Sequence, residues 1–313
     1  MLRILIIIAL SGLVGTTAKA DWVLSVSASG KFIVINSQEG KKVLMNSLQK
    51  KVLCELDSLF EPVSWIKDSV LILQEEKEMR AIYRSYNINT GEYKVLDSIA
   101  KKDWDLMGSV CYGSCPLHIE SWEQFFIVFY RDNKLYRYSF KEQKATCIYE
   151  LALASEEDID NISVNYDGTQ LVVSLAGKTT GRHLIIYPDK QRSCVLNKFK
   201  TFGSSGSQCY FVNADNIVLF NVAEKNDVRK TVVEVFNTKR CVKKKLTTVE
   251  HLTLVNPYAL PLQHEIAINA LAPPSYSVDL SKEPQGWIRL LDDYFSSMHT
   301  VAFKYHFDRV KPD

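Results

Sequence analysis

The chain has 313 residues, 46% of them hydrophobic, and a formal net charge of +2 at pH 7. This near-neutral balance argues against a nucleic-acid partner held by bulk charge. A chain of this length could form two domains, but no Pro-, Ser- or Gly-rich linker divides it, so we expect a single one.

The first twenty residues have the parts of a secretory signal peptide. Arg3 supplies positive charge, an apolar run follows from Ile4 to Val14, and Ala18-Lys19-Ala20 forms a small-x-small cleavage site. The apolar run is shorter than the about 20 residues that cross a bilayer, which favours a cleaved signal over a membrane anchor. We therefore expect a mature chain from Asp21, a periplasmic or secreted location, and no transmembrane segment after cleavage.

Short apolar runs separated by turn residues recur along the chain. In the clearest unit, Asn165–Leu196, an Asp167-Gly168 turn precedes two apolar runs, and Pro188-Asp189-Lys190 precedes a third. Such runs predict antiparallel strands joined by turns. Similar units begin near residues 23, 63, 119, 208 and 251, at a spacing of roughly 40 to 55 residues, each with four short strands that we label A to D.

A period of this length with four strands per repeat is typical of a β-propeller. One small sheet cannot bury both of its faces, whereas sheets stacked in a ring can. A β-sandwich is the alternative, but it would not repeat the A–B turn, the B–C loop and the C–D turn in the same order. We predict an all-β propeller over residues 21–313, with six four-stranded blades and seven as the alternative.

The fourth unit resembles a known family. Its residues Asn165-Tyr-Asp167-Gly168-Thr-Gln-Leu171-Val-Val, followed by Leu184-Ile-Ile-Tyr187 and Asp189, are similar to the repeat of TolB-like propellers. The resemblance covers about residues 23–246. It concerns the propeller part only, because the repeats follow the expected signal peptide directly, where TolB has an α/β domain. It implies a six-bladed ring, an extracytoplasmic location and a role in binding proteins or ligands.

The end of the chain departs from the repeat. Apolar residues at helical i, i+3, i+4 and i+7 spacing predict a short helix at about residues 287–298 that packs on the ring. These residues are Trp287, Leu290, Leu291, Tyr294, Phe295 and Met298. After them, alternating Val301, Phe303, Tyr305 and Phe307 predict a final strand.

Seven cysteines would face an oxidising compartment after secretion. Four fall near the start of D strands in different units: Cys54, Cys147, Cys194 and Cys241. Equivalent positions in different blades lie far apart on a ring, and a disulfide needs Cα atoms within about 7 Å, so these four should not pair. Cys111 and Cys115, close together in CYGSC, are the candidate disulfide, and Cys209 is expected to be a buried inner-strand thiol.

Motifs that carry chemistry are weak. None of the six histidines belongs to an HExxH motif, CYGSC lacks a second ligand pair for a metal, and no GxSxG motif is present. We predict no metal site, no cofactor and no catalytic residue. The most basic run, Lys239-Arg240 with Lys243-Lys244-Lys245, is interpreted as guarding the edge of an outer strand, with a phosphate-binding patch as the alternative.

Long or charged loops are expected on one face of the ring, which the B–C and D–A connections share. They are residues 74–80, 97–121, 154–162, 177–183, 197–207, 223–230 and 272–285. Because functional residues collect on loops held by a rigid scaffold, we expect a protein or envelope partner on this face. The longest loop carries Trp104, Tyr112 and His118, which we predict as partner contacts. The alternatives are that the loops are tolerated insertions and that Trp104 packs against a neighbouring blade.

These observations favour a secreted or periplasmic, non-catalytic propeller that acts as a binding scaffold for a protein or ligand in the cell envelope. The alternative is a propeller enzyme, a lyase or hydrolase that acts on a glycan or peptide at the channel mouth. Such an enzyme needs His, Asp, Glu or Arg side chains that converge at the inner ends of several blades.

Overall fold

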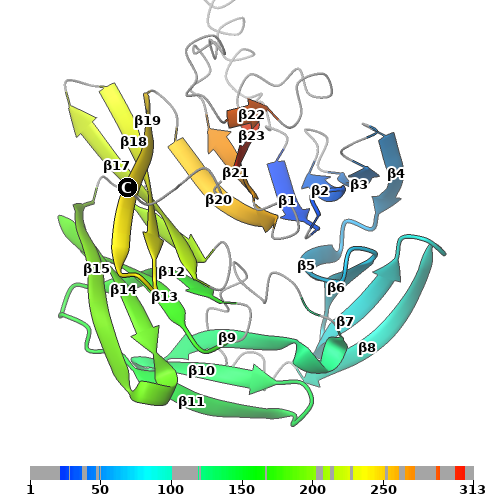
Figure 1. Ribbon diagram of the computed structural model, residues 1–313. Helices are drawn as coiled ribbons and strands as arrows, with labels where there is room; N and C mark the ends of the chain where they lie inside the picture. Colours follow the sequence, from blue (N-terminus) through cyan, green and yellow to red (C-terminus); the bar gives the residue numbers. More distant parts are fainter. Residues whose placement is uncertain are drawn as a thin grey trace, which may run out of the picture.

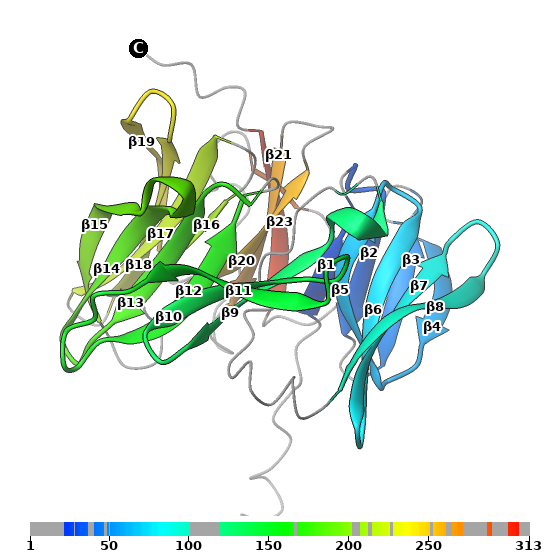
Figure 2. The same ribbon diagram turned by 90° about the horizontal axis from the view of Figure 1, so that it is seen from below.

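A computed structural model describes most of the chain between residues 22 and 306. The described residues are 22–27, 29–36, 41–46, 49, 51–100, 119, 121–165, 168–201, 207–211, 215–225, 228–250, 253–260, 265–271, 287–289 and 300–306. Their strands form six antiparallel sheets, numbered here in chain order, which surround a common centre (Figure 1). Figure 2 shows the same ring from the side.

The sheets are meanders, and in sheets 1 to 5 neighbouring strands follow one another in the chain. Sheet 1 holds β1 (Trp22–Val26), β2 (Phe32–Asn36), β3 (Lys42–Asn46) and β4 (Lys51–Leu56). Sheet 2 holds β5 (Phe60–Ile66), β6 (Val70–Lys77), β7 (Arg80–Asn87) and β8 (Glu92–Ala100). Sheet 3 holds β9 (Phe126–Arg131), β10 (Lys134–Ser139) and β11 (Lys144–Glu150).

The second half of the ring has the same plan until its last sheet. Sheet 4 holds β12 (Asp158–Val164), β13 (Leu171–Ala176), β14 (Thr180–Tyr187) and β15 (Arg192–Lys200). Sheet 5 holds β16 (Gln208–Phe211), β17 (Asn216–Lys225), β18 (Val228–Asn237) and β19 (Val242–Glu250). Sheet 6 has the order β20 (Thr253–Leu260), β21 (Glu265–Leu271), β23 (Thr300–His306) and β22 (Trp287–Arg289).

The all-β propeller is confirmed, and a sandwich is excluded, because the sheets follow one another around a ring and β1 lies against both β5 and β20. The expectation of six four-stranded blades, with seven as the alternative, is wrong: in the described residues five of the six sheets are four-stranded blades, and sheet 3 has three strands. Residues 121–125 form a turn that leads into β9 and contains the 3-10 helix η1 (Trp122–Gln124). The preceding residues 101–118 and 120 lie outside the described part.

The prediction of a C-terminal helix is also wrong for residues 287–289, the only part of it that the structure describes. Trp287–Arg289 is the strand β22, which pairs with Tyr305, Lys304 and Phe303 of β23. The ladder that β23 offers satisfies backbone groups over these residues, and this pairing outweighs the local helical periodicity. The final strand is confirmed as β23, and residues 290–299 and Phe307 lie outside the described part.

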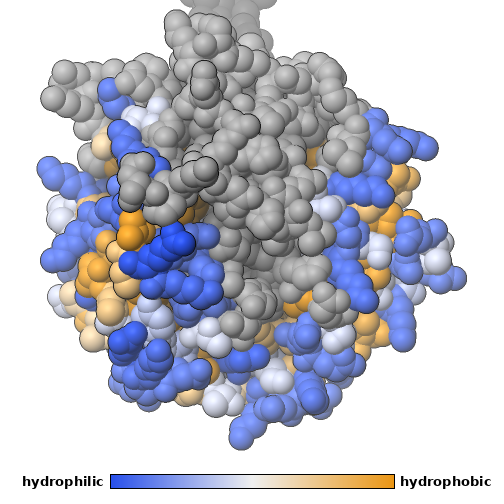
Figure 3. Space-filling view, in the orientation of Figure 1, coloured by the Kyte–Doolittle hydropathy of each residue, from blue (hydrophilic) through white to orange (hydrophobic). Residues whose placement is uncertain are grey.

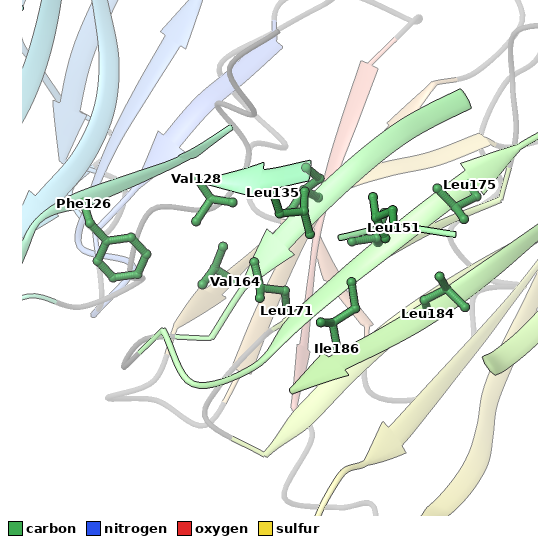
Figure 4. Close-up of a cluster of buried hydrophobic side chains, with 11 residues drawn as sticks. Phe126, Val128, Leu135, Leu151, Val164, Leu171, Leu175, Leu184 and Ile186 are labelled. Atoms are coloured by element: carbon green, nitrogen blue, oxygen red, sulfur yellow. The ribbon is translucent and has the colours of Figure 1, made fainter. Parts of the chain in front are cut away.

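The core consists of apolar layers between neighbouring sheets. Strand β13 shows why: Leu171, Val173 and Leu175 pack with sheet 3, whereas Val172, on the opposite face, packs with sheet 5. A strand buried on both faces therefore reads as a nearly continuous apolar run. Figure 4 shows the layer between sheets 3 and 4, where each fully buried aliphatic side chain contributes about 1.5–3 kcal/mol.

The C–D turns of sheets 1, 2, 3 and 5 share a local hydrogen bond. The side chain of the first turn residue accepts a hydrogen bond from a backbone N–H two or three residues later, as at Asn87, where Asn89 N donates to Oδ1 at 2.9 Å. The same bond forms at Asn46, Ser139 and Asn237. Four turns end on a residue with positive φ: Gly91, Gln143, Gln191 and Cys241. In these four sheets the local bonds help to fix where the outer strand begins.

Within the described residues, no helix is long and apolar enough to cross a membrane.

Candidate functional site

The predicted contact residues Trp104, Tyr112 and His118 lie outside the described residues. The same is true of the candidate disulfide between Cys111 and Cys115. Both therefore stay predictions. The five cysteines that the structure describes carry free thiols, and four of them lie on or just before outer strands, as the spacing predicted: Cys54, Cys147, Cys194 and Cys241.

The expected loop-rich face is smaller than predicted, because strands extend into several expected loops. Strand β6 ends at Lys77 and β7 starts at Arg80, so the expected loop 74–80 is a two-residue hairpin turn. Strands β17 and β18 are separated by residues 226–227, and β13 and β14 by residues 177–179. Of the expected loops, the parts that the structure describes outside strands belong mainly to D–A connections.

Charged residues at the end of β6 explain this error. Glu75 is buried at 5% exposure, and its carboxylate pairs with Arg84 at 2.8 Å and Lys77 at 3.1 Å. Burial acts to raise the pKa of Glu75, but hydrogen bonds and charge from Lys77 and Arg84 outweigh it, so the net shift is downward. The sequence EEK was therefore interpreted as a solvated loop, although a buried ion pair holds it in the sheet.

A row of polar side chains crosses the face of sheet 4 that packs on sheet 5. The register pairs Asn161 with Ser174, Ser174 with His183, and His183 with Asn197, which brings all four to one face. His183 Nδ1 lies 3.1 Å from Ser174 Oγ, and Ser174 Oγ lies 3.2 Å from Cys209 Sγ on β16. All three of these side chains have 0% exposure.

The contacts from Cys209 to Ser174 and from Ser174 to His183 place a nucleophile near a base, but the pKa values of the thiol and the imidazole oppose catalysis. Burial lowers the pKa of His183 to about 3 and raises that of the Cys209 thiol to about 12. At neutral pH the imidazole and the thiol are therefore uncharged, and no substrate in solvent reaches them. His183 Nε2 is buried and has no hydrogen-bond partner, so the ring already carries a desolvation cost.

This cluster connects the blades rather than facing a ligand. Asn161 Nδ2 donates to the carbonyl of Cys209 at 2.8 Å, and Asn197 Nδ2 donates to Asn221 Oδ1 of sheet 5 at 2.6 Å. Cys209 was expected as a buried inner-strand thiol, which is confirmed on β16. The serine and histidine were missed, because their proximity depends on the strand register and not on spacing in the sequence.

Charged side chains also mark the B–C/D–A face of sheet 4. Arg182 Nη2 lies 2.7 Å from Glu157 Oε2, and its Nε donates to Oε1 of the same carboxylate at 2.8 Å. This two-point pair lowers the pKa of Glu157, with the hydrogen bond from Arg182 as the main cause. Among the described residues, no group of three or more His, Cys, Asp or Glu side chains could hold a metal ion.

No family model and no curated protein matches this sequence. Solved structures with a similar arrangement include TolB from Acinetobacter baumannii, with 12% identity, 72% of this chain and 54% of TolB covered, and a TM-score of 0.46. An oligogalacturonate lyase in complex with manganese has 10% identity, covers 90% of this chain and 75% of its own, and has a TM-score of 0.48.

The β-propeller domain of Cps50 (Swd1) from Myceliophteria thermophila has 10% identity, covers 80% of this chain and 93% of its own, and has a TM-score of 0.47. With 54% of the Acinetobacter TolB covered, the chain spans about half the length of that protein. The similar structures therefore include TolB, an enzyme and a WD-type propeller, and at these identities they assign no function to this chain.

Proposed function

We propose that this chain is a non-catalytic binding scaffold in the periplasm or secreted from the cell, with a protein as its partner. The observation that carries the proposal is a set of large apolar side chains exposed on the turns and outer strands of a rigid ring. Leu59 is 62% exposed, Met79 is 73% exposed and Val95 is 53% exposed. Figure 3 shows apolar side chains among hydrophilic ones at the outer edge of the ring.

Rigidity supports this role, because a preorganised surface loses less conformational entropy on binding. Buried hydrogen bonds connect neighbouring blades near their inner strands. Trp65 Nε1 of sheet 2 donates to Ser25 Oγ of sheet 1 at 2.8 Å, and Phe211 N of sheet 5 donates to Ser163 Oγ of sheet 4 at 2.9 Å. A shift of one blade that broke either bond without admitting water would leave a buried polar atom unpaired, at a cost of about 1–3 kcal/mol.

The location and the contact loop complete the proposal. A signal peptide at residues 1–20 would deliver the chain across the inner membrane, and the intact mass of protein from its native host, starting at Asp21 or at Met1, decides this. The loop that carries Trp104, Tyr112 and His118 would supply the contacts on the B–C/D–A face.

The test is capture of the partner from the native host with a tagged mature chain. Its variant has residues 101–118 replaced by a short Gly/Ser linker, and a matched control has the exposed Glu78 in the β6–β7 turn replaced by Gly. Partner capture should persist in the control and be lost in the loop variant, while circular dichroism and the melting temperature stay close to wild type. A folded loop variant that still captures the partner places the contact elsewhere. Turnover of a glycan or peptide by the purified chain would instead favour the enzyme.

A further inference from the structure

The outer edges of sheets 4 and 5 form a surface that we call the basic rim. It comprises the C–D turn and outer strand of sheet 4, residues 188–200, and residues 239–245 of sheet 5. The first segment has one acidic residue, Asp189, and the second has none. Its basic residues are Lys190, Arg192, Lys198, Lys200, Lys239, Arg240, Lys243, Lys244 and Lys245. All of these side chains are exposed except Lys244, which is half-buried.

The outer strands of sheets 1 to 3 lack this excess. Strand β4 has Lys51 and Glu55, and β8 has Lys94 between Glu92 and Asp97. Strand β11 begins with Lys144 and ends with Glu150. All of these strands are edges of their sheets, so protection of an edge does not require so many cations. The whole chain has a formal charge of only +2, so the positive charge of the basic rim is local.

The two halves of the basic rim belong to neighbouring blades that are connected. Asn197 of β15 donates to Asn221 of β17 at 2.6 Å, and Asn221 Nδ2 donates to Glu234 Oε2 of β18 at the same distance. Glu234 also pairs with Lys243 at 3.2 Å. On sheet 4, Arg192 lies 4.7 Å from the Tyr187 ring centroid, which orients its guanidinium at the start of the outer strand.

Strand β19 also presents a backbone edge. It is the last strand of sheet 5, and among the described residues only β18 pairs with it. Lys243 and Lys245 stand two residues apart, opposite Phe236 and Glu234, so their side chains lie on one face of the strand. Edges of this kind accept an added strand, with backbone hydrogen bonds for affinity and alternate side chains for specificity.

We propose that the basic rim binds an acidic, extended polypeptide segment that adds to the edge of β19. Like charges directly opposite each other on paired strands are destabilising, so the lysines disfavour pairing with a second copy of this edge. Carboxylates at alternate positions of a partner strand face the lysines instead and gain about 0.2–1 kcal/mol for each pair. This inference rests on the proposed function as a protein-binding scaffold and specifies the chemistry of its partner.

The observations favour a polypeptide over an anionic membrane. The apolar residues exposed in the basic rim are Val195 and Val242. Membrane-bound surfaces usually insert Trp, Phe or Leu, and no side chain of these types is exposed among residues 188–200 and 239–245. The spacing of Lys243 and Lys245 also matches the two-residue period of an extended chain.

The test uses fluorescence anisotropy with a labelled peptide of alternating Glu and Val, about eight residues long, which exceeds a typical strand only slightly. Wild-type protein should bind it, more weakly at high salt, and should not bind the matched Lys-Val peptide. The variant Arg240→Glu with Lys245→Glu should lose affinity by about tenfold or more. The control Lys94→Glu with Lys144→Glu has the same net charge and should stay within about twofold of wild type.

A second peptide separates strand addition from bulk attraction. The same Glu-Val sequence with every backbone nitrogen methylated keeps the carboxylates and the valines but has no backbone donor, so its affinity should fall well below that of the unmethylated peptide. Equal binding of both peptides would refute strand addition. Equal losses of peptide affinity in the rim variant and in its control would show that binding depends on non-specific charge. Binding to vesicles with anionic phospholipids but not to the peptide would show that the rim is a membrane-binding surface. Either result overturns the proposal.

The two proposals can fail separately. If the native partner is captured equally well by wild type and by the rim variant, the scaffold function stands and the basic rim is not its site. If no protein is captured while the peptide still binds, the rim chemistry stands and the proposed function fails.

Discussion

Acid should destabilise this protein through His183, at a pH where most carboxylates are still ionised. The ring is buried between sheets 4 and 5, with the hydroxyl of Ser174 at 3.1 Å from Nδ1 and no partner for Nε2. Its pKa is lowered by burial from 6.5 to about 3. The folded state therefore binds fewer protons than the unfolded state between these values. Stability is full above about pH 6.5 and falls as the pH decreases toward 3.

The size of the effect follows from this shift. A lowering from 6.5 to about 3 corresponds to about 5 kcal/mol when the pH is below both values. Between pH 7 and pH 5 the same two values give a loss of about 2 kcal/mol. Glu75 and Glu157 have lowered pKa values, so their stabilising contributions are lost mainly below their ordinary value of 4.5. These two carboxylates therefore contribute little to the change between pH 7 and 5.

The assay is urea unfolding followed by fluorescence at pH 7 and pH 5, for wild type and for His183→Gln. The glutamine keeps a polar group beside Ser174 but does not titrate. Wild type should lose about 2 kcal/mol more than the variant over this interval, whatever the variant costs at pH 7. An equal pH dependence in both proteins would show that His183 is either solvated or already charged in the fold, and the burial argument would be wrong.

Three further predictions test side chains of sheets 4 and 5 and of the connection that leads into sheet 4. Gly181→Ala should lose about 1–3 kcal/mol in urea unfolding, because the added Cβ would lie 2.4 Å from two ring atoms of Phe199 and 2.5 Å from the backbone oxygen of Leu175; a neutral effect would show that both the ring and the backbone of β13 can move. Glu157→Gln should cost about 1–3 kcal/mol at pH 7 by weakening the pair with Arg182, and an unchanged midpoint would contradict that role. Cys209 should react with a thiol reagent only after unfolding, and its modification in the folded protein would contradict its burial. The exposed thiols, which should react in the folded protein, are Cys147, Cys194 and Cys241.

The repeat and its strand order could be predicted because they depend on local patterns. The Asp167-Gly168 turn is an example: Gly168 has a φ of 73°, which favours glycine, and the apolar run after it is the buried strand β13. The C–D turns of sheets 1, 2, 3 and 5 carry an equally local signal, an Asn or Ser at the end of strand C. This signal marks the starts of four outer strands in the sequence.

Pairing between distant segments could not be predicted in the same way. The helical periodicity from Trp287 onward was a local signal, and the free edge of β23 overrode it for the first residues. The polar row through His183 depends on four strands in register, so no spacing in the sequence reveals it. The buried Glu75 was misinterpreted for a similar reason, since its partner Arg84 is on the next strand.

Exposed positions on the outer strands tolerate substitutions, and these strands differ in charge. Binding can therefore be tested there by substitution. The first residues of β8, β11 and β15 are all exposed, whereas β13 is buried on both faces. Exposed positions on an outer strand have few packing partners, so most substitutions there change stability by less than about 0.5 kcal/mol. Folding therefore constrains the inner strands closely and leaves the charge of the outer strands nearly free. Folding therefore does not account for the difference in charge between the outer strands, whereas the acidic partner strand that we propose on β19 would account for it.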